Sequence, residues 1–268
     1  DIDPHAARDE LLDSIVLPLR DVDPAARECV VAMPGPFDDE TGVGSFDGVG
    51  KFASLAGVPL HAEFARRLGI DPTDVLFLND AVAYGIGEWA HDATRARRLV
   101  CITLGTGVGS AFLHDGSPVT GGPEAPEDGY AFRIRVHGVP LEDAASGRAI
   151  VRGFAERTGR PSTVVDIATA ARRGDAPARD ALDAASSALG LALGPWLERF
   201  AADELVIGGS ISRSWDLLEG PLLEGLEAGG YVPATVRRSA LLADAPLLGA
   251  ADWYTRTARA ARPARADL

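Results

Sequence analysis

The stretch Leu99-Val-Cys-Ile-Thr-Leu-Gly-Thr-Gly-Val-Gly109 joins an apolar run to a turn in which glycine alternates with other residues. The first six residues are apolar or β-branched, which is typical of a strand buried on both faces. The missing Cβ atoms of the glycines let backbone N–H groups approach phosphate oxygens, and Thr106 adds a hydroxyl donor. A tight hairpin that needs positive φ angles explains the turn equally well, so the stretch alone predicts a strand end and leaves its ligand open.

Two other predicted strands also end at residues that suit a ligand site. The run 74–78 leads into Asn79 and Asp80, and the run 205–207 leads into Gly-Gly-Ser at 208–210. A carboxylate fixed at Asp80 can take the proton from an alcohol that attacks a phosphoryl group. Asn and Asp are also favoured helix caps, so from this dipeptide alone the cap is the favoured interpretation. Asn79 is the only asparagine in a chain without glutamine, which favours a chemical need for a carboxamide there.

The alternation of strands and helices predicts an α/β architecture with ligands at the glycine-rich strand ends. The loop 92–97 is the best domain boundary, between a smaller lobe over 1–95 and a larger lobe over 96–268, whose last helix is expected to pack back on the first. We expect the helix at 177–200 to be interrupted at Pro195. The other expected helices cover residues 6–19, 59–68, 81–91, 141–158, 163–173, 214–228 and 249–262.

Charge excludes one class of partner. The 268 residues carry 26 basic and 39 acidic side chains, a formal net charge of −13. A nucleic acid needs a basic face, so we expect no such partner, whereas a nucleotide needs only a local pocket of amides and a metal. No apolar run reaches membrane-spanning length, and the start has no signal-peptide pattern. Cys29 and Cys101 both lie in apolar runs and are interpreted as buried hydrophobic residues rather than as a disulfide or a metal pair. Together these features predict a cytoplasmic protein with no membrane partner.

The strand ends form part of a longer set of motifs that resembles the ROK family of bacterial glucokinases, related hexose and N-acetylhexosamine kinases and sugar-responsive repressors. The resemblance covers about residues 28–250, and five motifs in one order are far more specific than any one of them. The motifs are Pro34-Gly35-Pro36; Leu78-Asn79-Asp80-Ala81-Val82-Ala83 with Gly87-Glu88; Thr103-Leu104-Gly105-Thr106-Gly107-Val108-Gly109; Leu141-Glu142 with Ala145-Ser146-Gly147; and Val206-Ile207-Gly208-Gly209-Ser210-Ile211-Ser212.

The resemblance implies an actin-like ATPase fold, of the ribonuclease H-like type, with two lobes and a ligand cleft between them. It implies a sugar kinase that uses ATP and Mg2+, with a small-molecule sugar as substrate and a homodimer as the assembly. Asp80 would be the general base, and Asn79 and Gly35 would bind the sugar. The implied nucleotide and phosphate ligands are Gly105, Thr106, Gly107, Gly208 and Gly209.

The chain departs from the family at its start. The family opens with a strand and an Asp-x-Gly-Gly-Thr turn that orients metal and phosphate, and the sequence contains neither. We interpret the difference as an N-terminally incomplete chain, because a central strand would otherwise be missing from a sheet. The alternative is a degenerate kinase that has lost one phosphate loop.

The loop before residue 141 departs from the family at its zinc and sugar sites. Pro140 and Arg135 stand at two cysteine positions of the Cys-x-Cys-Gly-x-x-Gly-Cys motif, so we expect no zinc and assign no metal ligand. The sugar-binding Glu-x-Gly-His appears as Glu127-Asp128-Gly129-Tyr130. Glu127 is a candidate for binding sugar hydroxyls, and Glu124 competes with it because the loop is shortened. A solvated acidic loop explains both residues equally well.

Two further charged residues flank the candidate base in the sequence. Lys51, in Gly-Val-Gly-Lys-Phe, does not meet the spacing of a P-loop and is interpreted as a loop lysine near the cleft. Glu88 lies about two helix turns after Asp80, and it either lines the cleft or is exposed.

The resemblance leaves the acceptor and the donor open. The changes surround the sugar site, so the acceptor is a hexose or a related cyclitol. Polyphosphate-dependent glucokinases also carry Leu-Gly-Thr-Gly and lack the zinc motif, but an acidic chain disfavours a polyanionic donor. The other alternative is a non-catalytic sugar-sensing regulator. The retained Asn79-Asp80 pair and the turn 105–107 favour an enzyme, because a sensor does not need a phosphate turn.

Overall fold

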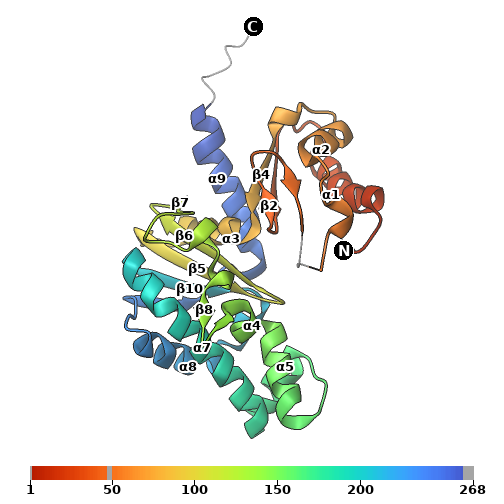
Figure 1. Cartoon of the computed structure of the whole chain (residues 1–268). Helices are drawn as coiled ribbons and strands as arrows, with labels where there is room; N and C mark the ends of the chain where they lie inside the picture. Colours follow the sequence, from red (N-terminus) through yellow and green to blue (C-terminus); the bar gives the residue numbers. More distant parts are fainter. Residues whose placement is uncertain (1, 47–49, 262–268) are drawn as a thin grey trace. The chain divides into compact units, whose positions relative to one another are not determined.

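The computed structural model of the chain describes residues 2–46 and 50–261, which fold into two compact units (Figure 1). The first unit contains the residues up to Ala83 together with the last helix from Ala250 onward, and the second is Tyr84–Gly249. The units divide inside helix α3 (Asp80–His91), whereas the sequence analysis placed the boundary at the loop 92–97. The physical reason is that α3 packs within the second unit from Tyr84 onward.

A pair of parallel strands, β1 and β4, organises the first unit. The register runs from Cys29 opposite Val75 to Met33 opposite Asn79. Helices α1 and α2 pack against each other, and Leu11 of α1 shares a core with Phe64 of α2. The elements are α1 (Arg8–Val22), β1 (Cys29–Met33), β2 (Phe37–Asp38), β3 (Val43–Gly44), η1 (Ala53–Leu55), α2 (Leu60–Leu68), η2 (Pro72–Asp74) and β4 (Val75–Asn79).

The second unit carries a five-stranded sheet in the order β11-β10-β5-β6-β7. Strands β11, β10 and β5 are parallel, while β6 and β7 run antiparallel to their neighbours. The carboxyl ends of β5 and β10 therefore meet at one edge of the sheet, where ligands bind in α/β folds. The strands are β5 (Arg98–Leu104), β6 (Val108–His114), β7 (Ser117–Pro118), β10 (Glu204–Gly208) and β11 (Thr235–Arg238), with a separate hairpin of β8 (Arg135–Val136) and β9 (Val139–Pro140).

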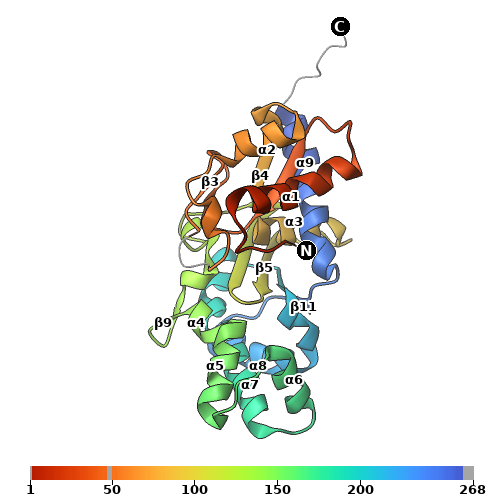
Figure 2. The ribbon, with the colours of Figure 1, turned by 90° about the vertical axis from the view of Figure 1, so that its right-hand side faces the viewer.

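Helices α7 and α8 of the second unit lie side by side (Figure 2). Helix α7 runs without a break through Pro195, so the predicted interruption was wrong. Pro195 removes one backbone hydrogen bond, but buried residues along α7, from Ala178 to Phe200, hold the helix in place by packing. The helices are α4 (Leu141–Ala145), α5 (Gly147–Thr158), α6 (Val164–Arg172), α7 (Ala176–Phe200), α8 (Trp215–Ala228) and α9 (Ala245–Ala261), with 3-10 turns at Glu127–Gly129, Ala131–Arg133, Ser210–Ser214 and Leu242–Asp244.

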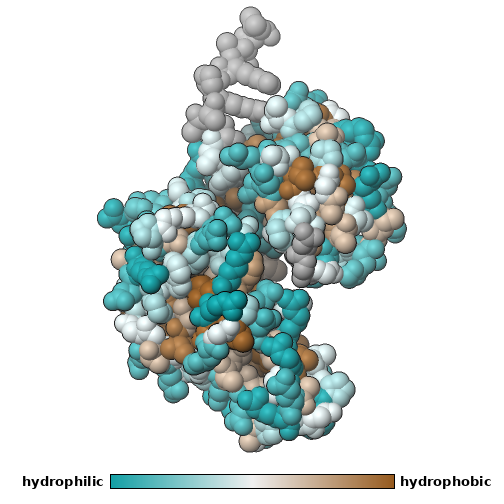
Figure 3. All heavy atoms as spheres, in the orientation of Figure 1, coloured by the Kyte–Doolittle hydropathy of each residue, from teal (hydrophilic) through white to brown (hydrophobic). Residues whose placement is uncertain are grey.

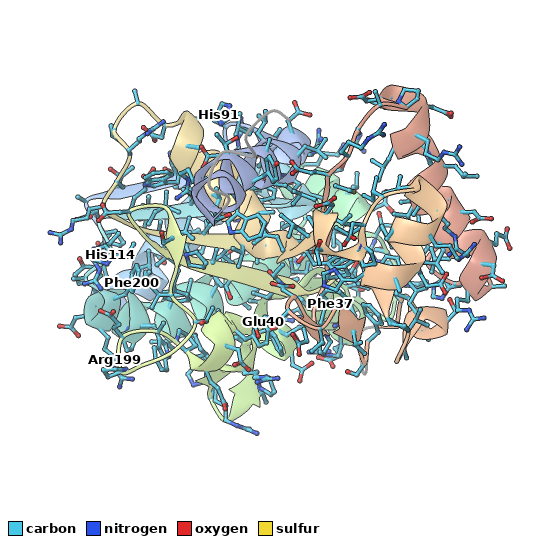
Figure 4. The ribbon with its side chains drawn as sticks, turned by 90° about the horizontal axis from the view of Figure 1, so that it is seen from above. Phe37, Glu40, His91, His114, Arg199 and Phe200 are labelled. Carbon is cyan, nitrogen blue, oxygen red and sulfur yellow. The ribbon has the colours of Figure 1, made fainter. Side chains whose placement is uncertain are left out.

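Each unit has its own aromatic contacts in the core. The ring of Phe37 in the first unit packs edge-on against Phe77 at 5.0 Å, and that of Phe200 in the second packs against Phe112 at 5.3 Å. Figure 4 labels Phe37 and Phe200. Hydrophilic residues cover most of the face seen in Figure 3. In the part of the chain that the structure describes, no helix combines the length and the apolar character needed to cross a membrane.

Glycines let α7 and α8 touch backbone to backbone. A Cβ atom at Gly190 would lie 2.3 Å from the carbonyl oxygen of Leu222, and one at Gly225 would lie 2.3 Å from that of Ser187. Such distances are far below any real Cβ contact. A side chain at either position would therefore force the two helices apart.

Gly190→Ala is expected to lower the free energy of unfolding by about 1–3 kcal/mol, because the added methyl group overpacks the helix crossing. Gly220→Ala is the matched control, since it lies on the exposed face of α8 with nothing within 4 Å of the added Cβ. The control should raise stability by about 0.5–1 kcal/mol, because alanine loses less backbone entropy in a helix. Urea unfolding measures both changes, and effects of the same sign would contradict the described crossing.

Candidate active site

Asn79 and Asp80 stand where β4 ends and α3 begins. The Oδ1 atom of Asn79 accepts hydrogen bonds from the N–H groups of Ala81 (3.0 Å) and Val82 (3.1 Å). Asn79 is therefore the cap of α3, the role that the sequence analysis weighed for this dipeptide. Its side-chain NH2 group donates no hydrogen bond within the described residues, so it is available to a ligand.

The carboxylate of Asp80 accepts a hydrogen bond from the N–H of Ala81 (2.8 Å) and keeps an exposed surface. Surrounding protein atoms raise the pKa of Asp80 by reducing its hydration, while the N–H groups of Ala81 and of Asp80 itself and the charge of Lys51 act in the opposite direction. Protein atoms therefore flank the carboxylate closely enough to reduce its hydration, although the residue as a whole is exposed to solvent. A carboxylate in that environment suits a base that must meet a substrate hydroxyl.

Asp39 is a second acidic group near Asn79, and the sequence analysis did not assign it. Asp39 is exposed by surface area, but nearby protein atoms reduce the hydration of its carboxylate and raise its pKa to about 6. A hydrogen bond from the Asn79 N–H acts against the rise, and the charge of Asp38 adds to it. No motif marks Asp39, because its neighbours come from another part of the chain. Gly35 lies at the same end of the β1–β4 pair, because it comes two residues after Met33, which pairs with Asn79.

The turn Gly105-Thr106-Gly107 joins β5 to β6. The N–H of Gly105 donates to the carbonyl oxygen of Gly107 (3.0 Å), and the N–H of Val108 donates to Oε2 of Glu142 (3.1 Å). Within the described residues, the N–H groups of Thr106 and Gly107 and the Thr106 hydroxyl have no hydrogen-bond partner, and Thr106 is exposed. Free donors gathered on one turn are the arrangement that binds phosphate oxygens.

Helix α5 begins directly against this turn. The N–H of Gly147 donates to the carbonyl oxygen of Gly105 (2.9 Å), and a Cβ at Gly147 would lie 2.7 Å from that oxygen. Glu142 supports the turn from another side, because a Cβ at Gly107 would lie 2.5 Å from its Oε2, and Arg148 pairs with its other oxygen. The positive end of the α5 dipole therefore lies beside the turn and favours an anion there.

The turn after β10 touches the turn after β5. Gly208 stands opposite Thr103 in the strand register. Gly209 has a φ of 79°, and a Cβ there would lie 2.3 Å from the carbonyl oxygen of Leu104. Only glycine fits both conditions. The structure thus brings together Gly105, Thr106, Gly107, Gly208 and Gly209, the residues singled out for nucleotide binding.

The two candidate glutamates of the loop before α4 have different surroundings. Glu127 is exposed, and its loop is held to β6 because the Ser110 hydroxyl donates to the carbonyl oxygen of Gly129 (2.6 Å). Glu124 pairs with Arg98 at the start of β5, and strand geometry puts this end about 20 Å from the end that carries the phosphate turn. We therefore keep Glu127 as the sugar-binding candidate.

Comparison with known proteins identifies the family. The sequence model of the ROK family matches residues 4–257. The chain belongs to the ROK family. It is 32% identical over 251 residues to the glucokinase of Thermotoga maritima, and the alignment covers 82% of this chain and 77% of that protein.

Solved ROK structures share the fold. A ROK family glucokinase from Streptomyces griseus, in complex with glucose and AMPPNP, has a TM-score of 0.74 and 25% identity, covering 93% of this chain and 88% of that one. A ROK family transcriptional regulator, a homologue of the Escherichia coli MLC protein, has a TM-score of 0.73 and 21% identity, covering 92% of this chain and 69% of that one. The predicted actin-like ATPase fold is confirmed.

The segment that the sequence analysis compares with the zinc motif forms a hairpin. Arg135 and Pro140, the residues predicted to stand at two cysteine positions, pair with each other in the β8–β9 hairpin. The Arg135 guanidinium also donates to the carbonyl oxygen of Gly138 (2.6 Å). In the described parts of the chain, no three His, Cys, Asp or Glu side chains come together as a metal site. Backbone pairing thus closes this loop, and the expectation of no bound zinc stays a prediction.

The neighbouring carboxylates Asp38 and Asp39 should titrate apart. Hydrogen bonds from Thr41 hold the pKa of Asp38 below 3.8, while that of Asp39 is about 6. Carbonyl-detected NMR measures both pKa values, and the variants Asp38→Asn and Asp39→Asn assign each signal to its residue. Because the folded pKa of Asp39 is raised, its stabilising effect is present at low pH and is lost as pH rises from 3.8 to about 6. Two carboxyls that titrate together near 4 would show that Asp39 is hydrated.

Proposed function

We propose that this protein is an ATP-dependent sugar kinase that transfers the γ-phosphoryl group of ATP to a hydroxyl of a hexose or a related cyclitol. That it is a sugar kinase follows from its membership of the ROK family and its identity with a glucokinase over most of the chain. The assignment of donor, acceptor and individual residue roles rests on the site described above.

The observation that carries the proposal is the division of roles between Asn79 and Asp80. Asn79 caps α3 through its Oδ1 atom with two backbone N–H groups, so the helix start does not depend on the Asp80 carboxylate. Asp80 keeps an exposed surface and a raised pKa. A carboxylate that is not required as a cap, and whose basicity is raised, supports the role of general base.

In the proposed reaction, Asp80 accepts the proton of the attacking sugar hydroxyl as its oxygen bonds to the γ-phosphorus, in line with the departing ADP oxygen. The NH2 group of Asn79 and the carboxylate of Glu127 bind other hydroxyls of the sugar. The free N–H groups of Thr106 and Gly107 hold phosphate oxygens at the start of α5. Mg2+, when bound, would supply positive charge that offsets part of the negative charge of the phosphates.

The alternatives are weaker. A regulator of this family shares the fold. A pure sugar sensor, however, has no use for donors at the end of β5, and those of Thr106 and Gly107 have no partner among the described residues. A polyphosphate donor is disfavoured because the chain carries a net charge of −13 and a long polyanion needs an extended basic groove. A homodimer and a cytoplasmic location belong to the proposal.

Asp80→Asn should lower kcat by roughly 10²–10⁴-fold, because the amide cannot accept the hydroxyl proton. The KM for the sugar and the melting temperature should change little, since the new Oδ1 can still accept the Ala81 N–H. Asp71→Asn is the matched control, because Asp71 also accepts a backbone N–H, that of Thr73 (2.9 Å), at a helix start of the same unit. Steady-state kinetics of both variants decide the point, and full turnover in Asp80→Asn would leave Asp80 with a structural role only.

The pH profile gives an independent readout of the base. Asp80 acts only when deprotonated, so kcat/KM should fall as pH drops through its pKa, and the fall should begin above the usual Asp range because that pKa is raised. If the residual activity of Asp80→Asn shows the same fall in kcat/KM at low pH, that fall is caused by another group. Asp39, with a pKa of about 6, is the first to test by Asp39→Asn.

A further inference from the structure

A buried chain of hydrogen bonds lies under the Gly208-Gly209 turn and starts at Glu88 of α3. Glu88 is only 2% exposed, and its carboxylate accepts hydrogen bonds from Arg237 Nη1 (2.6 Å), Ser239 Oγ (2.6 Å) and the Leu241 N–H (2.9 Å). Burial acts to raise the pKa of Glu88, but these hydrogen bonds outweigh it and hold the pKa below its usual value. Glu88 is therefore ionised, and of the two sequence interpretations the exposed one was wrong.

An ionised carboxylate only accepts hydrogen bonds, and this fixes the direction of the whole chain. The Ser239 hydroxyl must give its one proton to Glu88, so it accepts the hydrogen bond from the Tyr84 hydroxyl (2.7 Å). The Tyr84 oxygen, whose proton is committed to Ser239, accepts the N–H of Gly209 (3.3 Å). One polarised chain thus runs from Gly209 through Tyr84 and Ser239 to Glu88.

The ring of Tyr84 also fits the turn by shape. A Cβ at Gly208 would lie 2.5 Å from its Cε1 atom, so the end of β10 rests directly on the ring. Gly209 in turn touches the carbonyl oxygen of Leu104, the residue before the Gly105–Gly107 turn, since a Cβ at Gly209 would lie 2.3 Å from that oxygen. Tyr84 supports Gly209, and Gly209 supports the end of β5.

We propose that Tyr84 is a positioning residue for the nucleotide: through Gly209 it holds both glycine turns in the geometry that binds ATP. The inference rests on the proposed function, because it takes these turns to be the ATP site. The Gly209 N–H is committed to Tyr84, so Gly209 meets the nucleotide through its Cα surface. The phosphate donors are then the N–H groups of Thr106 and Gly107.

Tyr84→Phe keeps the ring but leaves the Gly209 N–H without its acceptor. We expect the KM for ATP, and the Kd for a non-hydrolysable ATP analogue, to rise about tenfold, while the KM for the sugar stays within about twofold. Ser239→Ala removes the next link and should produce the same ATP-specific loss. The double variant should be no worse than either single variant, because both break one chain.

Tyr231→Phe is the matched control. The Tyr231 hydroxyl donates to the carbonyl oxygen of Ala202 (2.9 Å), just before β10 and at the opposite end of that strand from Gly208. The control removes a comparable hydrogen bond in the same unit. It should lower the melting temperature to a similar extent without changing the constants for ATP.

Several outcomes would overturn the proposal. Equal rises in the ATP and sugar constants of Tyr84→Phe, or the same ATP effect in Tyr231→Phe, would indicate a general loss of stability. Calorimetry with the ATP analogue needs no sugar, so it separates this proposal from the proposed function. Wild-type protein that binds the analogue and phosphorylates no sugar counts against the function alone, whereas failure to bind the analogue overturns both.

Discussion

The close packing of α3 is the constraint on which the rest of the site depends. A Cβ at Gly85 would lie 2.8 Å from the Cβ of Ala111, and one at Gly87 would lie 2.1 Å from the carbonyl oxygen of Ala245. The helix therefore lies closer to β6 and to the start of α9 than any side chain would allow. Its position is then fixed by the buried carboxylate of Glu88, and its first residue is Asp80, the proposed base.

Local patterns were enough to predict most strands and helices, because continuous apolar runs such as 99–104 and 205–207 end at glycine. The boundary between the two units could not be predicted from local patterns. It depends on contacts of α3 with distant residues, among them Ala111 and Ala245, which leave no periodic trace in the sequence. The unbroken course of α7 through Pro195 has the same cause, since tertiary packing overrides the local preference against proline.

For the site, the sequence located the strand ends but not the roles of single residues. Whether Asn79 or Asp80 caps α3 is decided by which oxygen faces the N–H groups of Ala81 and Val82, and only coordinates supply that. The choice between Glu124 and Glu127 depends on Arg98, which is distant in sequence from both. Tyr84 accepts the N–H of Gly209, a residue far along the chain, so no motif marks its role. Glu142 lies in a motif, but its contact with the Val108 N–H is visible only in the structure.

The account's central claim is that Asp80 meets the sugar hydroxyl while the turn after β5 holds the phosphates. A crystal structure of the protein with a hexose and a non-hydrolysable ATP analogue tests it most directly. The account predicts a sugar hydroxyl within hydrogen-bond distance of the Asp80 carboxylate and in line with the γ-phosphate, whose oxygens accept from the N–H groups of Thr106 and Gly107. Phosphates bound away from those two N–H groups, or a sugar without contact to Asp80, would contradict it.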